Sequence, residues 1–330
     1  MQKTPPVIIV YHADCIDGAA AAWIIAKSRG AESTAAFIPY DHADAAAGEG
    51  ALRAALASGG TVYFADITPE KNFLDGLLAG GHEVHVLDHH KSAAQTLDGR
   101  KAPGLHVVFD PAAPSAAKMI WSYFFPAENP PAVVALIDLM DGAAQGLKTP
   151  EDFAAAALVD AQNIRTPDGA LAALRGLAKL SFNDMAEKGA PLAAGQDAHI
   201  DALFERAAVA RLQILPDSPL LDVPIVNGRL KDYGRRISER LVELGEKSGA
   251  NVAFMWVLQK NGAVSLSIRT NGVPDASAVA GHLCKTAGAT GGGHKDAAAV
   301  HFASLADFMK HVKIAPPQSP KIRPEPPSPS

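Results

Sequence analysis

The sequence contains very little cysteine. Only Cys15 and Cys284 occur among its 330 residues, and they lie too far apart to form a CxxC pair. Two such cysteines exclude a disulfide framework and a redox or zinc motif of that spacing. The N-terminal segment also lacks the long apolar core and small-residue cleavage site of a secretory signal peptide. We therefore expect a cytoplasmic protein.

Long hydrophobic runs and an excess of basic charge are absent as well. No apolar run reaches the roughly 20 residues that a membrane-spanning helix needs, so we expect no membrane partner. Lys and Arg number 30 against 35 Asp and Glu, which gives a net charge of −5. An acidic chain argues against a surface that grips long duplex nucleic acid by neutralising its phosphates. The composition therefore favours small or short substrates.

The first third of the chain alternates two patterns. Short β-branched or aromatic runs are followed by alanine-rich stretches with helical periodicity, such as 18–27 after 7–11. This alternation predicts an α/β domain built on a parallel sheet. The predicted strands are Val7–Tyr11, Ala36–Tyr40, Thr61–Ala65, Glu83–Leu87 and His106–Phe109.

The second half predicts a helical segment from Pro130 to about Ala210 and then a smaller α+β domain. Asn261-Gly262 between two alternating runs indicates a hairpin. The proline- and serine-rich end cannot bury a core, so we expect it to be disordered. The predicted strands are Asp222–Val226, Asn251–Gln259, Ala263–Arg269 and Ala297–Phe302, and the predicted helices are Arg229–Lys247, Asp275–Ala287 and Ser304–Val312. The predicted divisions are a first domain (1–190), a helical connector (191–216), a second domain (217–314) and a disordered tail (315–330).

Carboxylates and imidazoles follow three of the predicted strands at the point where each strand ends. Each one alone is ordinary, because Asp often caps a helix and a lone His is usually structural. Together at one sheet edge they would repel one another unless cations neutralised them. Mixed oxygen and nitrogen ligands suit Mn²⁺, with Mg²⁺, Co²⁺ or Fe²⁺ as alternatives. The residues are His12, Asp14 and Asp17 after the first strand, Asp66 after the third, and Asp88, His89 and His90 after the fourth.

Two motifs connect the sequence to a known family. Val86-Leu87-Asp88-His89-His90-Lys91 resembles the signature of the DHH phosphoesterase superfamily. Gly291-Gly292-Gly293-His294-Lys295-Asp296-Ala297-Ala298 resembles the glycine-rich motif of its C-terminal DHH-associated domain. The resemblance covers roughly residues 5–305, and the two motifs in this order are specific as a pair. It implies a DHH catalytic domain over 1–190 and a substrate-binding domain over 217–314, in a subgroup similar to nanoRNases.

The resemblance also implies roles for individual residues. It implies two divalent ions bridged by Asp66, with His90 facing the substrate phosphate and Asp88 orienting the histidines. A fourth motif should supply one more aspartate, for which Asp141 is favoured over Asp138. The implied metal ligands are His12, Asp14, Asp17, Asp66, His89 and Asp141.

The first motif departs from the family pattern. The family spaces it as His, three residues, Asp, one residue, Asp, whereas this chain has His12, one residue, Asp14, two residues and Asp17. Either a one-residue loop change still lets Asp14 reach the first ion, or fewer protein groups and more water hold that ion. Cys15, between these positions, either tunes the site, is sensitive to oxidation or is a small buried residue.

The glycine run has physical properties that suit a phosphate. Successive glycines expose backbone N–H groups and allow close approach by an anion. An arginine can grip phosphate through two hydrogen bonds, although a glycine-rich turn beside an exposed arginine is the ordinary alternative. By resemblance, the substrate-binding residues are Ser267, Arg269, Gly291, Gly292, Gly293 and His294.

These features predict a metal-dependent phosphodiesterase with two divalent ions, Mn²⁺ favoured over Mg²⁺ and Co²⁺. It would activate a water and hydrolyse oligoribonucleotides or linear dinucleotides to nucleoside monophosphates. The alternatives are a phosphatase of nucleotide or inorganic phosphoanhydrides, and a non-catalytic nucleotide-binding regulator that has lost the first ion. The expected partner is a short nucleotide or phosphate ester, and the sequence leaves open whether the chain forms a homodimer.

Overall fold

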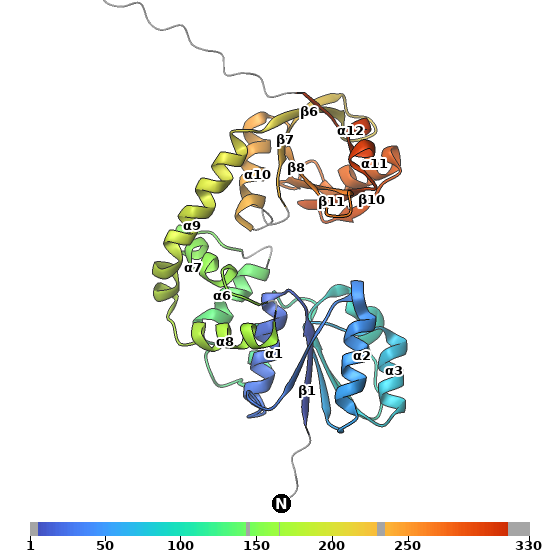
Figure 1. The fold of residues 1–330 in the computed structure, drawn as a ribbon, viewed down its shortest axis with the longest axis vertical. Helices are drawn as coiled ribbons and strands as arrows, with labels where there is room; N and C mark the ends of the chain where they lie inside the picture. The colour runs from blue at the N-terminus through green and yellow to red at the C-terminus, as the bar shows by residue number, and fades with distance from the viewer. Residues whose placement is uncertain (1–5, 143–145, 165, 230–234, 316–330) are drawn as a thin grey trace, which may run out of the picture. The chain divides into compact units, whose positions relative to one another are not determined.

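A computed structural model describes residues 6–142, 146–164, 166–229 and 235–315 (Figure 1). The chain divides into two compact units, residues 1–193 and 194–330, and the division falls within helix α9 (Phe182–Phe204). Each unit is built on a sheet of its own. Within the described ranges, no helix has both the length and the apolarity needed to cross a membrane.

The N-terminal unit is built on a five-stranded parallel sheet with the order β2-β1-β3-β4-β5. Helix α1 covers one face of this sheet, and α2 and α3 cover the other (Figure 1). Strand β1 lies next to β3 in the sheet, and β3 lies next to β4, so the carboxyl ends of these three strands are neighbours. The strands are β1 (Val7–His12), β2 (Ala36–Tyr40), β3 (Thr61–Ala65), β4 (Glu83–Asp88) and β5 (Leu105–Phe109).

Helices follow the strands, and a helical group completes the unit. Two of the short segments are 3₁₀ helices, η1 (His42–Asp44) and η2 (Lys91–Ala93). The α-helices are α1 (Ile16–Ser28), α2 (Ala45–Leu56), α3 (Lys71–Ala79), α4 (Ala94–Leu97), α5 (Ala116–Phe124), α6 (Ala132–Asp141), α7 (Pro150–Asp160), α8 (Pro167–Leu177) and α9.

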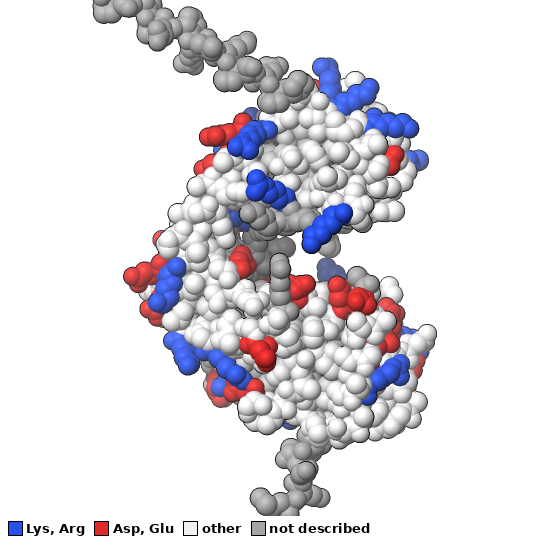
Figure 2. Space-filling view, viewed as in Figure 1, with Lys and Arg blue, Asp and Glu red and all other residues white. Residues whose placement is uncertain are grey.

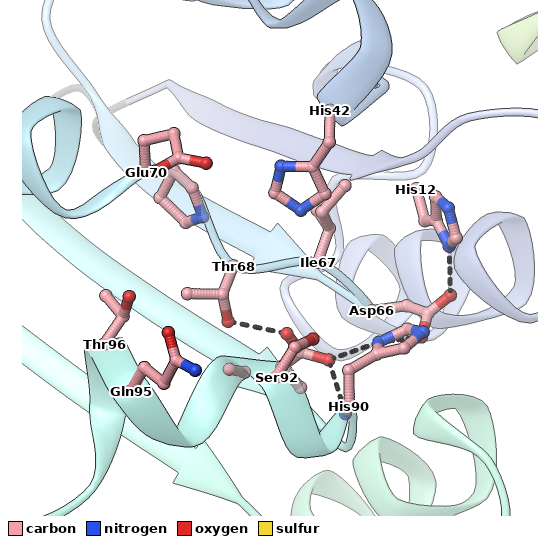
Figure 3. Close-up of a pocket in the computed structure, with 13 residues that line it drawn as sticks. His12, His42, Asp66, Ile67, Thr68, Glu70, His90, Ser92, Gln95 and Thr96 are labelled. Carbon is pink, nitrogen blue, oxygen red and sulfur yellow. Dashed lines mark hydrogen bonds and ion pairs between the residues drawn. The ribbon is translucent and has the colours of Figure 1, made fainter. Parts of the chain in front are cut away.

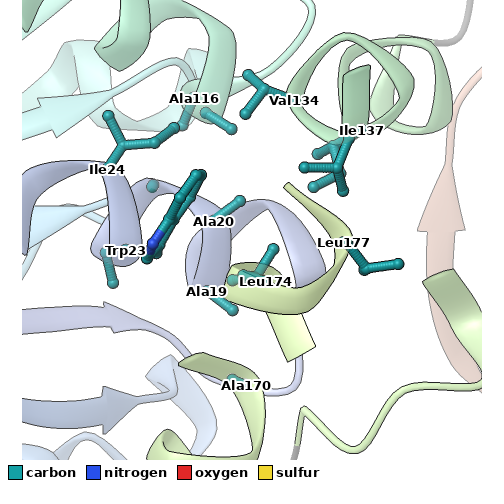
Figure 4. Close-up of a cluster of buried hydrophobic side chains, with 14 of the residues drawn as sticks. Ala19, Ala20, Trp23, Ile24, Ala116, Val134, Ile137, Ala170, Leu174 and Leu177 are labelled. Atoms are coloured by element: carbon teal, nitrogen blue, oxygen red, sulfur yellow. The ribbon is translucent and has the colours of Figure 1, made fainter. Parts of the chain in front are cut away.

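Helix α1 is buried on all sides. Every residue from Asp17 to Ala26 is buried, which requires helices or strands around the whole helix. Its alanines allow α5, α6 and α8 to approach closely, and Trp23 packs among them (Figure 4). The arrangement fixes the start of α1, and thereby Asp17, against the rest of the unit.

Side chains that accept hydrogen bonds from backbone N–H groups define where several helices begin. Ser115 caps α5, Thr149 forms a capping box with Asp152 at α7, and Thr166 caps α8. Such caps satisfy backbone donors that have no partner inside the helix. The position of α5 matters for the site described below.

The C-terminal unit contains a seven-stranded mixed sheet with the order β10-β11-β9-β8-β7-β6-β12. Only the pair β7 and β8 is parallel. One face packs on α11 and α12, and the other packs on α10 and the end of α9. The strands are β6 (Ala208–Gln213), β7 (Leu220–Asn227), β8 (Val252–Leu258), β9 (Val264–Thr270), β10 (Thr290–Gly293), β11 (Ala297–Phe302) and β12 (Lys313–Ala315), and the helices are α10 (Arg235–Ser248), α11 (Ala276–Ala287) and α12 (Leu305–His311).

The predicted fold class, an α/β parallel-sheet domain followed by a smaller α+β domain, is confirmed. Three local predictions differ from the structure. The helical connector predicted over 191–216 is helical only to Phe204, and residues 208–213 form β6. The glycine run, for which no strand was predicted, forms strand β10 at the end of the sheet order. Ala315, placed in the predicted tail, ends β12, while the rest of that tail lies outside the described residues.

Candidate metal centre

The structure brings the chemistry-bearing residues to the carboxyl edge of the N-terminal sheet. His12 ends β1, Asp66 follows β3, and Asp88 ends β4. Gly18 has a steric role here, because a Cβ at this position would lie 2.6 Å from the carbonyl oxygen of His12. Glycine therefore lets the first turn of α1 pack directly against the end of β1.

Asp66 lies at the centre of the cluster. Its Oδ2 atom is 3.4 Å from His12 Nδ1, and its Oδ1 atom is 3.3 Å from His89 Nε2. Asp66 is 1% exposed, and neither carboxylate oxygen has a hydrogen-bond partner. Its backbone φ of 60° is in the left-handed region, which is uncommon for a non-glycine residue. The backbone thus directs one carboxylate between two imidazoles.

His89 faces three carboxylates. Its Nε2 atom lies 3.7 Å from Asp17 Oδ2 and 3.6 Å from Asp141 Oδ2, in addition to the contact with Asp66. On the other side of the ring, Nδ1 is 3.0 Å from the carbonyl oxygen of Ala113 and donates a hydrogen bond to it. This bond assigns a hydrogen to Nδ1 and leaves Nε2 as the ring atom directed at the carboxylates.

Asp17 is held by the start of helix α5. Its two carboxylate oxygens accept hydrogen bonds from the backbone N–H groups of Ala116 and Ala117, at 2.7 and 2.8 Å. Burial raises the pKa of Asp17 well above its usual range, and the nearby charges of Asp66 and Asp141 raise it further. A cation beside these carboxylates would remove that repulsion.

The structure separates the two aspartates considered for the fourth motif. Asp141 lies within reach of Asp17 and His89. Asp138 accepts hydrogen bonds from the Ser115 hydroxyl at 2.9 Å and from the Lys118 ammonium at 2.7 Å. Asp138 therefore has a structural role that joins α5 to α6, and the favoured Asp141 is the one in the cluster.

Asp88 orients His90. The Asp88 Oδ1 atom accepts hydrogen bonds from the His90 backbone N–H and from Nδ1, and its Oδ2 atom accepts one from the Thr68 hydroxyl at 2.6 Å. The hydrogen bond that His90 donates to Asp88 is the main reason that the pKa of His90 is raised. Both Asp88 oxygens are thus satisfied, which leaves His90 as the group presented to a ligand.

The first motif is arranged differently from the prediction. His12, Cys15 and Asp66 each present a donor atom within 4.8 Å of the others, whereas Asp14 is in none of the metal-binding groups among the described residues. Asp14 is exposed and has a left-handed φ of 52°. The structure therefore brings together His12, Asp17, Asp66, His89 and Asp141 of the predicted ligands, but not Asp14.

A pocket of about 390 Å³ opens beside Asp66 and His90 (Figure 3). Figure 3 shows polar side chains from the segment after β3 and from η2 and α4 around it. Most of these side chains could not be recognised from the sequence, because single hydroxyl and amide residues on a short helix form no motif. The additional polar lining residues are His42, Thr68, Glu70, Ser92, Gln95 and Thr96.

The predicted substrate-binding residues all lie in the C-terminal unit. Ser267 and Arg269 are on β9, and both pair with β11, where Ser267 is opposite Ala299. Gly292 on β10 also pairs with Ala299, so Ser267 and Gly292 are two strands apart. Arg269 donates to the carbonyl oxygen of Ile268, and His294 is exposed.

The three glycines of β10 differ in the space around them. A Cβ at Gly291 or Gly293 would meet backbone atoms of β11 at 2.2 and 2.4 Å. A Cβ at Gly292 would meet nothing within 4 Å. Packing therefore explains Gly291 and Gly293, whereas Gly292 is open to an approaching ligand.

The donor set fits divalent cations. Four buried atoms that could ligate metal have no hydrogen-bond partner: His12 Nδ1, both Asp66 oxygens and His89 Nε2. Such atoms are costly unless something binds them. Although burial alone would lower it, Asp66 and the Ala113 carbonyl raise the pKa of His89 to about 9, so protons occupy part of this site in the metal-free protein. Asp66 forms one group of possible ligands with His12 and Cys15 and a second with His89 and His90. His89 also forms a group with Asp17 and Asp141, so the linked groups offer enough donor atoms for two ions.

Comparison with known families identifies most of the C-terminal unit. Residues 226–315 match the DHHA1 domain family. This match confirms the resemblance stated for the glycine-rich motif, and the Asp88-His89-His90 motif lies at the edge of the other sheet. The chain therefore carries a DHHA1 domain at residues 226–315.

No curated protein matches the chain. Among solved structures, it is similar to RecJ from Thermus thermophilus in complex with Mn²⁺, with 16% identity over 90% of this chain and a TM-score of 0.47. The chain spans about half of that RecJ, 49% of its length. An exopolyphosphatase-related protein from Bacteroides fragilis is similar at 11% identity, with 94% of this chain and 92% of the other covered and a TM-score of 0.45. CDC45 from Entamoeba histolytica is similar at 7% identity, with 93% and 94% covered and a TM-score of 0.48.

Proposed function

We propose that this protein is a two-metal phosphodiesterase that hydrolyses oligoribonucleotides or linear dinucleotides to nucleoside monophosphates. The observation that carries the proposal is the position of Asp66, a buried carboxylate with no hydrogen-bond partner between two imidazoles. A carboxylate in this position can bridge two ions. The DHHA1 match supports metal-dependent phosphoester hydrolysis as the general class.

The chain supplies distinct ligands for the two ions. His12 and Asp66 would hold the first, and Asp17, His89 and Asp141 together with Asp66 would hold the second. When bound, divalent ions in such a pair lower the pKa of a water molecule and offset the charge on the phosphoryl oxygens. Mn²⁺ suits the mixture of imidazole and carboxylate.

His90 has the position of a substrate-contacting residue. It lines the pocket, and its side chain is 42% exposed, while Asp88 fixes the ring through Nδ1. With Nδ1 committed to Asp88, Nε2 remains to hydrogen-bond a phosphoryl or leaving oxygen. Because the pKa of His90 is raised, the ring carries a proton over a wider pH range and can donate it.

The pocket favours a nucleoside over a chain of phosphates. Its lining includes hydroxyl, amide and imidazole groups and Glu70, but no Lys or Arg of the described residues. A polyphosphate chain would require cations there, whereas a ribose and base require hydrogen-bonding groups. This observation favours a phosphodiesterase over a phosphatase of inorganic phosphoanhydrides.

The proposal extends to the C-terminal unit and to the partner. Arg269, Ser267 and His294 would bind the terminal phosphate of the nucleotide, with the exposed backbone of Gly292 beside them. Scattered Lys and Arg side chains, without a continuous basic patch, are visible on the face of this unit shown in Figure 2. A short nucleotide in the cytoplasm remains our proposed partner, rather than a long duplex or a membrane.

A substrate screen tests the proposal. Protein loaded with Mn²⁺ is incubated with pApA, longer 5′-phosphorylated RNA and DNA, cyclic dinucleotides, 3′-phosphoadenosine 5′-phosphate and polyphosphate. We expect pApA to give AMP as the main product, with turnover lost in His89→Ala. Preferred hydrolysis of polyphosphate would support the phosphatase instead. Nucleotide binding without turnover, with one ion or none per chain, would support the regulator.

A further inference from the structure

The first ion lacks the third protein ligand that its motif predicts. The side chain of Asp14 is exposed, and its backbone is in the left-handed region. The residue before it, Ala13, donates a backbone hydrogen bond to the carbonyl oxygen of Tyr40. Within the part of the chain that the structure describes, Asp14 joins no group of clustered ligands. Of the predicted ligands of the first ion, only His12 and Asp66 are therefore in place, and His12 Nδ1 lies 3.4 Å from Asp66 Oδ2.

Cys15 occupies the position of a third ligand beside His12 and Asp66. Its Sγ atom lies within 4.8 Å of the ligand atoms of both His12 and Asp66. Two of these neighbours, His12 Nδ1 and Asp66 Oδ2, are buried without hydrogen-bond partners, which independently marks this position as a cation site.

We propose that Cys15 replaces Asp14 as a thiolate ligand to the divalent ion at the first site. The proposal rests on the two-metal function above, because it assigns a ligand within that centre. Binding breaks the S–H bond, releases the proton to solvent and forms a sulfur–metal bond, with no change of oxidation state. The first site then presents one nitrogen, one sulfur and one oxygen from the protein.

This donor set changes which metal the first site selects. Sulfur ligands favour Co²⁺ and Zn²⁺, whereas carboxylate and water favour Mg²⁺. The second site, with one imidazole among carboxylates, has no sulfur. The two ions are therefore held by chemically different sites, and Mg²⁺ should compete poorly for the first one.

Cobalt provides a direct test, because a thiolate bound to Co²⁺ gives a charge-transfer band in the near ultraviolet. The metal-free protein is titrated with Co²⁺, and absorbance and bound cobalt per chain are recorded together. We expect the band in the wild type and in Cys284→Ser, and its loss in Cys15→Ser. The sequence has no third cysteine, so Cys284→Ser is the matched control. Cys15→Ser should also weaken cobalt binding at one site by at least the 10–100-fold typical of losing an outer-shell partner.

Two measurements keep the test decisive if Cys15→Ser does not fold. In the native protein, Mn²⁺ should protect Cys15 from alkylation, and a chelator should restore its reaction without changing that of Cys284. Cys15→Asp should fold, lose the cobalt band and gain affinity for Mg²⁺ by about tenfold or more, because it supplies a harder ligand.

The outcomes separate this proposal from the two-metal function. Two bound cobalt ions without the band, or a band that persists in Cys15→Ser, would overturn the role of Cys15 and leave the metal centre intact. Equal alkylation of Cys15 with and without Mn²⁺ would also overturn it. A chain that binds no cobalt at all would overturn both.

Discussion

Strand β4 carries a cluster of histidine and carboxylate at each of its two ends. At its beginning, Glu83 Oε1 lies 3.1 Å from His85 Nε2 and 3.7 Å from His106 Nε2. At its end, Asp66 and His89 meet at 3.3 Å. The residue types and the distances are similar, so neither feature distinguishes the two clusters.

The clusters differ in whether their polar atoms have partners. His85 donates to Glu83 and stacks on His106 with ring planes only 13° apart, and Glu83 is 53% exposed. Parallel rings cannot both direct an in-plane nitrogen lone pair at one ion. At the other end, His12, Asp66 and His89 present buried atoms without hydrogen bonds. Of the two clusters, the one at the end of β4 is therefore the stronger candidate for a metal site, because its buried polar atoms are unsatisfied and converge.

The largest effect should come from removing the carboxylate between the two imidazoles. Asp66→Asn removes a shared ligand, so we expect both ions to be lost or weakened and turnover to fall at least about 10³-fold, roughly 4 kcal/mol. Metal analysis together with steady-state rates on pApA would measure this. If the variant kept two ions and most of its activity, Asp66 would not be a metal ligand.

The two aspartates of α6 should respond in opposite ways. Asp141→Asn should lower the metal content to about one ion per chain, with little effect on stability, because its side chain is 34% exposed. Asp138→Asn should keep two ions but lower the free energy of unfolding by about 1–3 kcal/mol, because it weakens a buried acceptor of Ser115 and Lys118. Urea unfolding and metal analysis of both variants separate these effects, and an exchange of the two results would reverse our assignment.

Metal affinity should depend on pH. The pKa of His89 is raised to about 9, and that of Asp17 is also raised. Both side chains therefore hold protons more strongly in the folded metal-free protein than they would in water. Metal binding must release these protons, so affinity should rise with pH below about 9, by up to roughly tenfold per pH unit for each proton released. Calorimetry in two buffers of different ionisation enthalpy counts the protons. A constant affinity between pH 6 and pH 8 would contradict the raised pKa of His89.

The smallest effect should come from the other end of β4. Glu83→Gln removes the carboxylate between His85 and His106, yet metal content and turnover should be unchanged, and stability should change by no more than about 0.5 kcal/mol. This variant is the matched control for Asp66→Asn. Loss of a bound ion in Glu83→Gln would show that the presence or absence of hydrogen-bond partners does not distinguish metal sites in this chain.

Much of the fold could be predicted because the strands carry a strong local signal. Buried β-branched runs placed all five N-terminal strands within a residue or two, and the order of the motifs indicated where the ligands meet. β6 and β12 were not predicted. β12 pairs with β6, where Lys313 lies opposite Arg211 far away in the sequence, and β6 lies at the end of a stretch whose composition predicted helix. β10 was not predicted as a strand, because glycine has low strand propensity and only the contact with β11 makes it one.

The position of a candidate ligand was predictable where the residue follows a strand directly, as for Asp66 and His89. The direction of Asp14 was not predictable, because a one-residue change in loop spacing decides whether a side chain faces the cluster or solvent, and spacing alone does not give that direction. Gln95 and Thr96 could not be found from the sequence, since only their place beside Asp66 and His90 in the folded protein makes them part of the pocket.

Helix α1 links the metal centre to the folding of its unit. Its first turn supplies Asp17, and the residues from there to Ala26 are buried on every side. Such a helix cannot loosen at one end without exposing apolar surface along its length. Binding energy at the carboxyl edge is therefore transmitted to the middle of the unit, and the amide hydrogens of α1 should exchange with solvent more slowly when the ions are present.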